Sequence, residues 1–158
     1  MMVRHAGFTL IELAVTVAIV GILASAAVPL GQLGVKRAKE AELRSALRDI
    51  RTGIDAYKKA VDDGRIEKKL EDSGYPASLE LLVRGVPDLK DPKKRPLRFM
   101  RRIPRDPMFP DPEVNAQDTW GQRSYQSPPD DPQPGADVYD VYSMSREAGL
   151  NGIPYREW

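Results

Sequence analysis

The sequence predicts an α+β protein in which a long N-terminal helix carries a small, loop-rich head with a short antiparallel sheet. Three observations support this class. A run of 23 uncharged, mostly apolar residues separates Glu12 from Lys36, an amphipathic pattern follows it, and thirteen of the fourteen prolines lie at or beyond Pro76. The first two features favour one continuous helix, whereas frequent proline disfavours long regular elements in the remainder.

Composition narrows the classes of function. The chain has 158 residues, a formal net charge of +1, no cysteine and one histidine, His5, which lies before the apolar run in a segment that we expect to be removed. Without His and Cys, a protein cannot build Ser-His-Asp or Cys-His catalysis or an ordinary zinc site. No phosphate-binding G-x-x-x-x-G-K-[ST] loop is present. We therefore expect no enzyme activity and name no catalytic residue, although chemistry that uses carboxylates alone stays open.

The apolar run is long enough to span a membrane, because about 20 apolar residues cross a bilayer as a helix. Basic residues flank it on both sides, so the positive-inside rule is weak here. Two alternatives are an ordinary secretory signal, cleaved after Ala24-Ser25-Ala26, and an uncleaved anchor. Glu12 inside the apolar stretch and the unbroken continuation into an amphipathic helix argue against an ordinary signal.

The segment Gly7-Phe8-Thr9-Leu10-Ile11-Glu12-Leu13 resembles the leader of type IV pilins and type II secretion pseudopilins. The resemblance implies that a prepilin peptidase cuts between Gly7 and Phe8 and N-methylates Phe8. Residues 1–7 would then be a cleaved leader and residues 8–34 a transmembrane assembly helix. Glycine before the cut leaves the backbone accessible, since it has no Cβ.

Glu12 is expected to serve as the assembly charge. An acid near the start of a bilayer helix is costly and usually has a partner. In a staggered filament the natural partner is the free amino group of Phe8 on a neighbouring subunit. The alternative is a carboxylate that lies near the lipid headgroups.

Pro29 is expected to kink or locally unwind the helix, because its ring removes one backbone hydrogen bond and clashes one turn back. The sequence does not distinguish a segment that loosens on assembly from a static kink.

Residues 35–62 predict an amphipathic helix that ends at Asp62. Six apolar residues, spaced alternately by four and three, share one face. Such a face suits a coiled coil or the docking of a head, and its short length favours docking. The six residues of this head-docking seam are Leu43, Leu47, Ile50, Ile54, Tyr57 and Val61.

Residues 63–158 are expected to form a head in which loops predominate. We predict a helix over Ser78–Val83, mostly loop over 86–118, and strands over Ser124–Ser127 and Val138–Ser143. Residues 128–137 would connect the two strands.

Four segments of the head resemble landmarks of the major pseudopilin family, general secretion pathway protein G. They are Gly74–Leu79, Arg102–Pro107, Asp118–Gly121 and the closing Leu150–Trp158. The resemblance implies a pilin-like fold, a single pass through the bacterial inner membrane and a periplasmic head.

It also implies a subunit that polymerises with itself into a filament for protein export. Its partners would be prepilin peptidase, minor pseudopilins, an inner-membrane platform protein and an assembly ATPase. A type IV pilin or minor pilin for motility or DNA uptake is an alternative within the class, and a secreted ligand-binding domain is one outside it.

Calcium is a possible cofactor by family resemblance, because major pseudopilins commonly hold this ion in the loop after the last strand. Calcium needs six to eight oxygen ligands, and the family's paired acids are missing from this loop. Weak candidates are Ser143, Ser145, Glu147 and Asn151. We therefore expect no calcium site and predict that Tyr155 and Trp158 hold the closing segment by packing.

A basic cluster runs from Lys93 to Arg105 with Phe99 interleaved. A nucleic-acid or lipid-headgroup patch is one interpretation. Nearby aspartates dilute its field, which favours a solvated loop that meets acidic surface on the next subunit and makes nucleic acid an unlikely partner.

Overall fold

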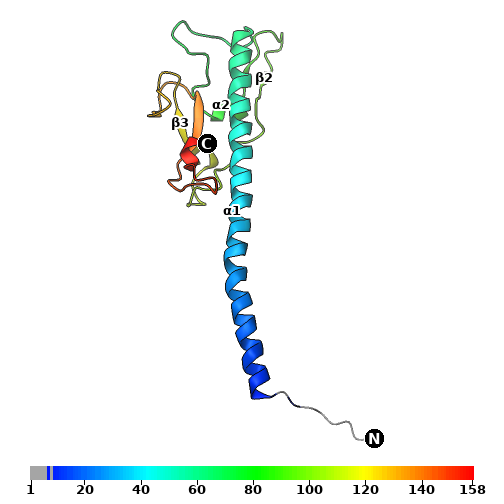
Figure 1. Cartoon of the computed structure of the whole chain (residues 1–158). Coiled ribbons are helices and arrows are strands. Elements are labelled where there is room, and N and C mark those ends of the chain that lie inside the picture. Colours follow the sequence, from blue (N-terminus) through cyan, green and yellow to red (C-terminus); the bar gives the residue numbers. More distant parts are fainter. Residues whose placement is uncertain (1–6, 8) are drawn as a thin grey trace, which may run out of the picture. The chain divides into compact units, whose positions relative to one another are not determined.

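The computed structural model describes residue 7 and residues 9–158, with residues 26–30 described by their backbone alone. The chain divides into two compact units, Met1–Ala38 and Lys39–Trp158. A single helix, α1 (Leu10–Asp62), supplies residues to both. Figure 1 shows the head elements gathered along the C-terminal part of α1.

The C-terminal end of α1 is defined by backbone hydrogen bonds, and the predicted end at Asp62 is confirmed. Gly64 has a positive φ of 67°. Its N–H bonds the carbonyl of Val61, and the N–H of Arg65 bonds the carbonyl of Ala60. This pair of bonds is the Schellman motif, in which a left-handed glycine satisfies the last carbonyls of a helix. Glycine fits because it adopts positive φ without steric penalty.

The head confirms the expected α+β class with short elements only. A helix, α2, covers Glu80–Arg84, two residues later at its start than predicted. Strands β1 (Val86–Pro87) and β2 (Pro96–Leu97) form one antiparallel pair, and β3 (Trp120–Arg123) and β4 (Asp140–Ser143) form the other. Two 3-10 helices, η1 (Ala116–Thr119) and η2 (Tyr155–Glu157), complete the order of elements.

The predicted strand over Ser124–Ser127 is wrong, because the strand lies four residues earlier. β3 pairs Trp120 with Ser143 and Arg123 with Asp140. At Ser124 the chain leaves the ladder, since its N–H bonds the carbonyl of Gln133 instead. A Cβ on Gly121 would lie 2.3 Å from the Tyr142 ring, so glycine allows this ring to lie across β3. The connection between β3 and β4 is consequently longer than residues 128–137.

All six seam residues are buried in the head's core. Leu43 and Ile50 are 0% exposed, as are Leu82 of α2 and Val141 of β4. Burying such side chains contributes roughly 1.5–3 kcal/mol each. This face of α1 is therefore an integral part of the head. The other core residues from α1 are Ala46 and Ala60, and those from elsewhere include Ile66, Leu79, Trp120, Val138 and Tyr155.

Candidate assembly site

Glu12 closes a hydrogen-bonded ring at the start of α1. Thr9 precedes the helix and donates to the Glu12 Oε2 from its backbone N, at 3.1 Å, and from its Oγ1, at 3.0 Å. The Glu12 N–H donates back to the Thr9 Oγ1 at 3.3 Å. This reciprocal arrangement is a capping box. The T-x-x-E motif is the sequence signal for this capping box, in addition to the charge of Glu12.

The first unit buries none of the described apolar side chains of α1. Leu10 is 89% exposed, Ile22 70% and Leu23 66%. Side chains from Leu10 to Ser25 are all exposed. Within the described part of the chain, no helix reaches the length and apolarity needed to cross a membrane.

Two predicted features lie partly outside the described residues. Gly7 is described and exposed, whereas Phe8, the proposed methylated residue, and residues 1–6 of the leader lie outside the described residues. The helical backbone of α1 continues through residue 29. The kink at Pro29 stays a prediction.

In the second unit, the closing segment is bound to α1 through Glu40, which sequence reasoning missed. Glu40 is 7% exposed, and its Oε1 accepts hydrogen bonds from the Leu150 N–H at 2.7 Å and the Tyr155 hydroxyl at 3.0 Å. Burial, and then the bond to Glu40, raise the pKa of Tyr155 to about 12. Glu40 lies three residues before Leu43, so it continues the spacing of the seam, and that position was the available signal.

Arg51 forms a second link between α1 and the end of the chain. Its guanidinium pairs with Asp140 at 2.8 Å and donates to the backbone oxygens of Val141 and Trp158. Arg44, two turns earlier, stacks on the Trp158 ring with 4.4 Å to its centroid. Tyr155 and Trp158 contact each other edge to face at 5.0 Å. Packing and arginine contacts thus hold the closing segment against the helix.

Asp106 is a carboxylate in the interior of the head, fully buried. Its Oδ2 accepts a 2.6 Å hydrogen bond from the Ser143 hydroxyl on β4, and its Oδ1 accepts one from the Met108 N–H. Burial is the main influence and raises the pKa of Asp106 above its ordinary value, although both hydrogen bonds oppose the shift.

The chain is 32% identical over 153 residues to the type II secretion system core protein G of Vibrio cholerae serotype O1, covering 92% of this chain and 86% of that protein. This chain belongs to the core protein G family of type II secretion. Its residues 2–28 also match the family model described as the prokaryotic N-terminal methylation motif.

Core protein G of Dickeya chrysanthemi and of Pectobacterium carotovorum subsp. carotovorum are 33% and 32% identical over 111 residues. Those matches cover 66% of this chain and 63% and 62% of the relatives. No solved structure matches the chain significantly. The assignment as a type II secretion pseudopilin is confirmed, and neither alternative is favoured by these comparisons.

The calcium expected for the core protein G family fits the residues of this chain poorly. The Ser143 hydroxyl donates to Asp106, the Ser145 Oγ accepts from the Glu147 N–H, and the Asn151 Oδ1 accepts from the Ile153 N–H. Three of the four weak candidates therefore already use their side-chain oxygens in hydrogen bonds within the head. Among the described residues, no three acidic, His or Cys side chains gather as a metal site would require. The absence of calcium stays a prediction.

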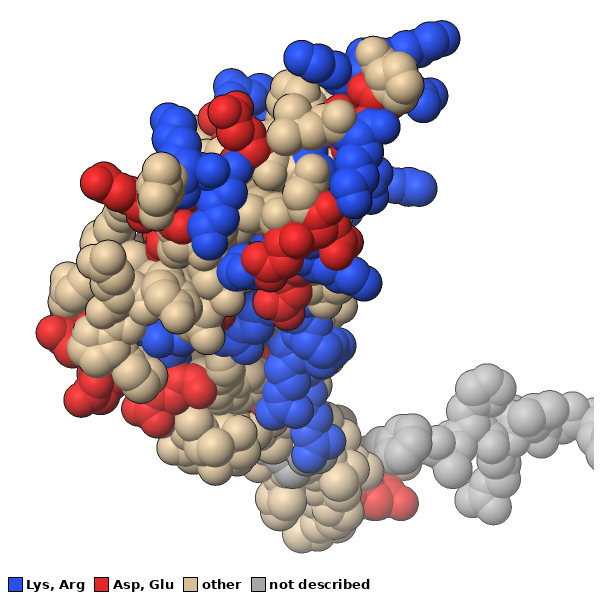
Figure 2. All heavy atoms as spheres, turned by 90° about the horizontal axis from the view of Figure 1, so that it is seen from above, with Lys and Arg blue, Asp and Glu red and all other residues tan. Residues whose placement is uncertain are grey.

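The basic cluster of residues 93–105 divides into two parts. Arg95 pairs with Asp91, and Arg105 donates to the carbonyls of Asp111 and Val114. Arg98, Arg101 and Arg102 are exposed. Figure 2 shows Lys and Arg spread over much of the face seen from above, with groups of Asp and Glu between them. Such mixing gives a weaker field than an uninterrupted basic patch.

Proposed function

We propose that this chain is a pseudopilin subunit that waits in the bacterial inner membrane and then polymerises into a periplasmic filament for protein export. The observation that carries the proposal is the contrast within α1. Its C-terminal part is buried in the head, whereas the described apolar side chains of Leu10–Leu23 are exposed. Exposed apolar surface of this extent marks a membrane or protein interaction site.

Processing prepares the subunit for assembly. A prepilin peptidase would cut between Gly7 and Phe8 and methylate Phe8, which leaves a positively charged amino group four residues before Glu12. In the single chain the Glu12 carboxylate caps its own helix through Thr9. In the filament it would gain the amino group of Phe8 on a neighbouring subunit. Two opposite charges that meet in an apolar environment select one register, because a charge left unpaired there costs several kcal/mol.

The other partners that we propose are those of the secretion family. They are minor pseudopilins, an inner-membrane platform protein and an assembly ATPase that supplies the energy for growth. The role of the subunit is mechanical, and we assign it no reaction. The names of its relatives, which are core components of type II secretion systems, support this view.

Intact-mass analysis of protein extracted from membranes tests the proposal, combined with electron microscopy of filaments. We expect loss of residues 1–7, a methyl group on Phe8, and filaments that depend on the peptidase. An N-terminus at Ala27 would identify an ordinary secretory signal and overturn the membrane anchor. Intact residues 1–7 in assembled filaments would overturn the processing step.

A further inference from the structure

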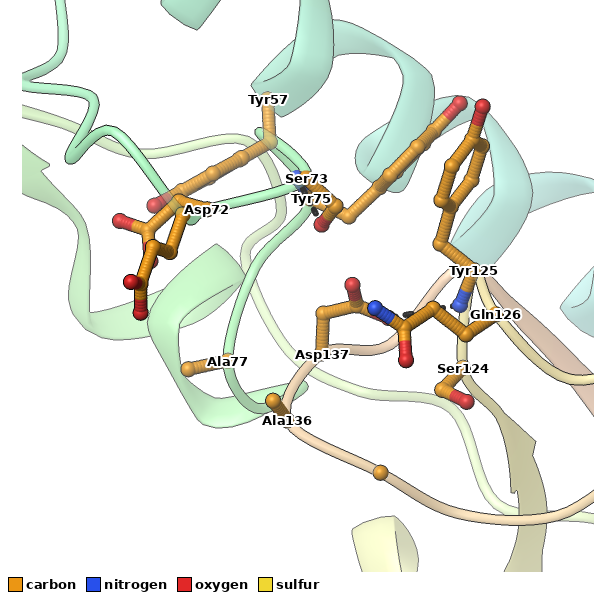
Figure 3. Close-up of a pocket in the computed structure, with 12 residues that line it drawn as sticks. Tyr57, Asp72, Ser73, Tyr75, Ala77, Ser124, Tyr125, Gln126, Ala136 and Asp137 are labelled. Atoms are coloured by element: carbon orange, nitrogen blue, oxygen red, sulfur yellow. Dashed lines mark hydrogen bonds between the residues drawn. The ribbon is translucent and has the colours of Figure 1, made fainter.

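A pocket of about 410 Å³ lies in the head between α1, the segment before α2 and the β3–β4 connection. Figure 3 shows Tyr57 and Asp72 on one side and the stacked rings of Tyr75 and Tyr125 on the other, with Asp137 between them. Its main lining groups are three tyrosines and three acids, namely Tyr57, Tyr75, Tyr125, Glu71, Asp72 and Asp137.

The aromatic part of the pocket is suited to a cation. The rings of Tyr75 and Tyr125 stack with centroids 5.6 Å apart, and Tyr139 meets Tyr75 edge to face at 4.9 Å. Tyr125 is 58% exposed, so a partner can reach its side chain. Two cations of the same chain already contact these tyrosines, with Lys58 5.8 Å from the Tyr75 ring centroid and Arg123 4.7 Å from the Tyr139 ring centroid. Aromatic faces attract cations through their quadrupole.

The carboxylates of the pocket have unused capacity. Asp137 uses its Oδ1 to accept the Tyr125 N–H, and Asp72 uses its Oδ2 to accept the Lys69 N–H. The ion pairs among the described residues involve other acids, which are Asp62, Asp88, Asp91 and Asp140. Within the part of the chain that the structure describes, the three pocket acids therefore lack a basic partner.

Residues 98–102 carry the complementary feature, which is arginine side chains without an acidic partner among the described residues. Arg98, Arg101 and Arg102 are exposed, and among the described residues they form no ion pair or hydrogen bond. Phe99 between them is partly buried and contacts Tyr57 edge to face at 5.4 Å, so the core fixes this segment. One molecule thus presents unpaired acids with aromatic rings on one surface and unpaired arginines on another.

We infer that the tyrosine–acid pocket receives arginine side chains of residues 98–102 from a second copy of this chain. The inference rests on the proposed filament and names one of its contacts. Every copy carries both surfaces, and they differ from each other, so the contact is head to tail. Contacts of this kind repeat without closing when the rotation does not return to the start, and they build filaments. Guanidinium groups suit the site because they stack on aromatic rings and bond carboxylates.

Cysteine cross-linking in assembled filaments tests the contact, and the natural chain contains no cysteine that would interfere. Gln126 lines the pocket, and Arg101 belongs to residues 98–102, called the basic segment. Both residues are exposed. The full chain with Gln126→Cys and Arg101→Cys should form a ladder of covalent oligomers on oxidation. Matched chains with Gln126→Cys and Arg146→Cys should form none, because Arg146 is exposed but lies outside the basic segment.

Charge reversal provides the second arm. Glu71→Lys with Asp72→Lys should reduce filament yield about tenfold, as should Arg101→Glu with Arg102→Glu, since like charges then face each other. Combining all four substitutions should restore most of the yield, whereas Glu113→Lys, an exposed acid outside the pocket, should have no effect. Each variant is first checked by thermal melting, because these exposed positions should leave the fold intact.

Filaments of wild-type protein with no ladder from the cysteine pair would overturn this contact alone. Cross-linking of Gln126→Cys to another protein of the secretion machinery would also overturn it, since the occupant would be a different molecule. Absence of wild-type filaments would overturn the proposed function, and this inference with it.

Discussion

The two units of this chain use the same helix in opposite ways. In Lys39–Trp158, α1 contributes six seam residues to a closed core, and two of its charged residues, Glu40 and Arg51, bind the end of the chain. In Met1–Ala38, the described apolar side chains are exposed and the start of the helix is closed by its own capping box. One part is stabilised from within the chain. The other depends on what surrounds it, which is the property required of an assembly element.

The largest effect that would test this contrast comes from Glu12. Replacing Glu12 with Ala should abolish filaments, by about a hundredfold or more, since an unpaired buried charge costs roughly 3–5 kcal/mol and about 1.4 kcal/mol corresponds to tenfold. The head should melt at an unchanged temperature. Filament yield by sedimentation and electron microscopy, together with circular dichroism of the membrane-extracted chain, measures both.

Glu12→Gln is the matched control for the capping box. Glutamine can close the same ring with Thr9 but cannot neutralise an amino group. We expect filaments to be lost in this variant too. Normal filaments from Glu12→Gln would show that capping, and not charge, is what assembly requires.

A pair of leucines on α1 tests the same contrast through stability. Leu47 is 2% exposed and Leu23 is 66% exposed. Leu47→Ala should lower the free energy of unfolding of the head by about 2–5 kcal/mol, because it leaves a cavity in the core. Leu23→Ala should change it by less than about 0.5 kcal/mol. Thermal or urea unfolding in detergent distinguishes them, and equal effects would contradict the division into two units.

Tyr155→Phe removes one of the two donors to the buried Glu40 carboxylate. Hydrogen bonds to charged groups contribute roughly 1.5–3 kcal/mol, and the ring remains to fill the space. We expect a loss of stability of that size. Spectrophotometric titration of the wild-type protein should also show one tyrosine that ionises near pH 12. A variant as stable as the wild type would show that packing alone holds the closing segment.

Asp106→Asn should alter how stability depends on pH. Burial raises the pKa of Asp106 above its unfolded value, so its contribution to stability is fully present below that value and is lost as pH rises through the folded pKa. The asparagine variant should therefore gain stability relative to the wild type as pH rises from about 4.

Asp88→Asn offers a control of opposite sign. The Arg65 guanidinium, 2.6 Å away, holds the pKa of Asp88 below its ordinary value. That group stabilises the fold above its unfolded pKa and loses this effect as pH falls. If the stabilities of the two variants, relative to the wild type, changed in the same direction with pH, the assigned directions of the two pKa shifts would be contradicted.

Calcium should have the smallest effect. A melt of the full chain in detergent should be the same with millimolar calcium and with chelator. A ligand present at about a hundred times its dissociation constant would add about 2.7 kcal/mol, which shifts a melt by several degrees. A clear calcium-dependent rise would mean that the ligands lie elsewhere than in the closing loop.

The extent of α1 could be predicted because the spacing of its apolar residues and the glycine that ends it, Gly64, are signals between residues that are near in sequence. The register of β3 could not, because it depends on Tyr142 lying across Gly121, a contact between segments that are distant in sequence. The capping box is visible in the sequence as T-x-x-E, although the charge of Glu12 also fits a partner on a neighbouring subunit. The seam spacing marks the position of Glu40, but the partners of Glu40 and Arg51 could not be predicted, because they lie 110 and 107 positions further along the chain.

The double acceptor role of Glu40 has a mechanical consequence. One carboxylate oxygen joins α1 to Leu150, a separation of 110 positions along the chain, and Arg51 reaches Trp158 across 107. A tensile force along α1 would reach the head near these hydrogen bonds. The last residues of the chain would therefore bear part of that force from the start. A subunit in a growing filament would therefore resist unfolding under force, because its final segment is hydrogen-bonded to α1, the helix that carries the force.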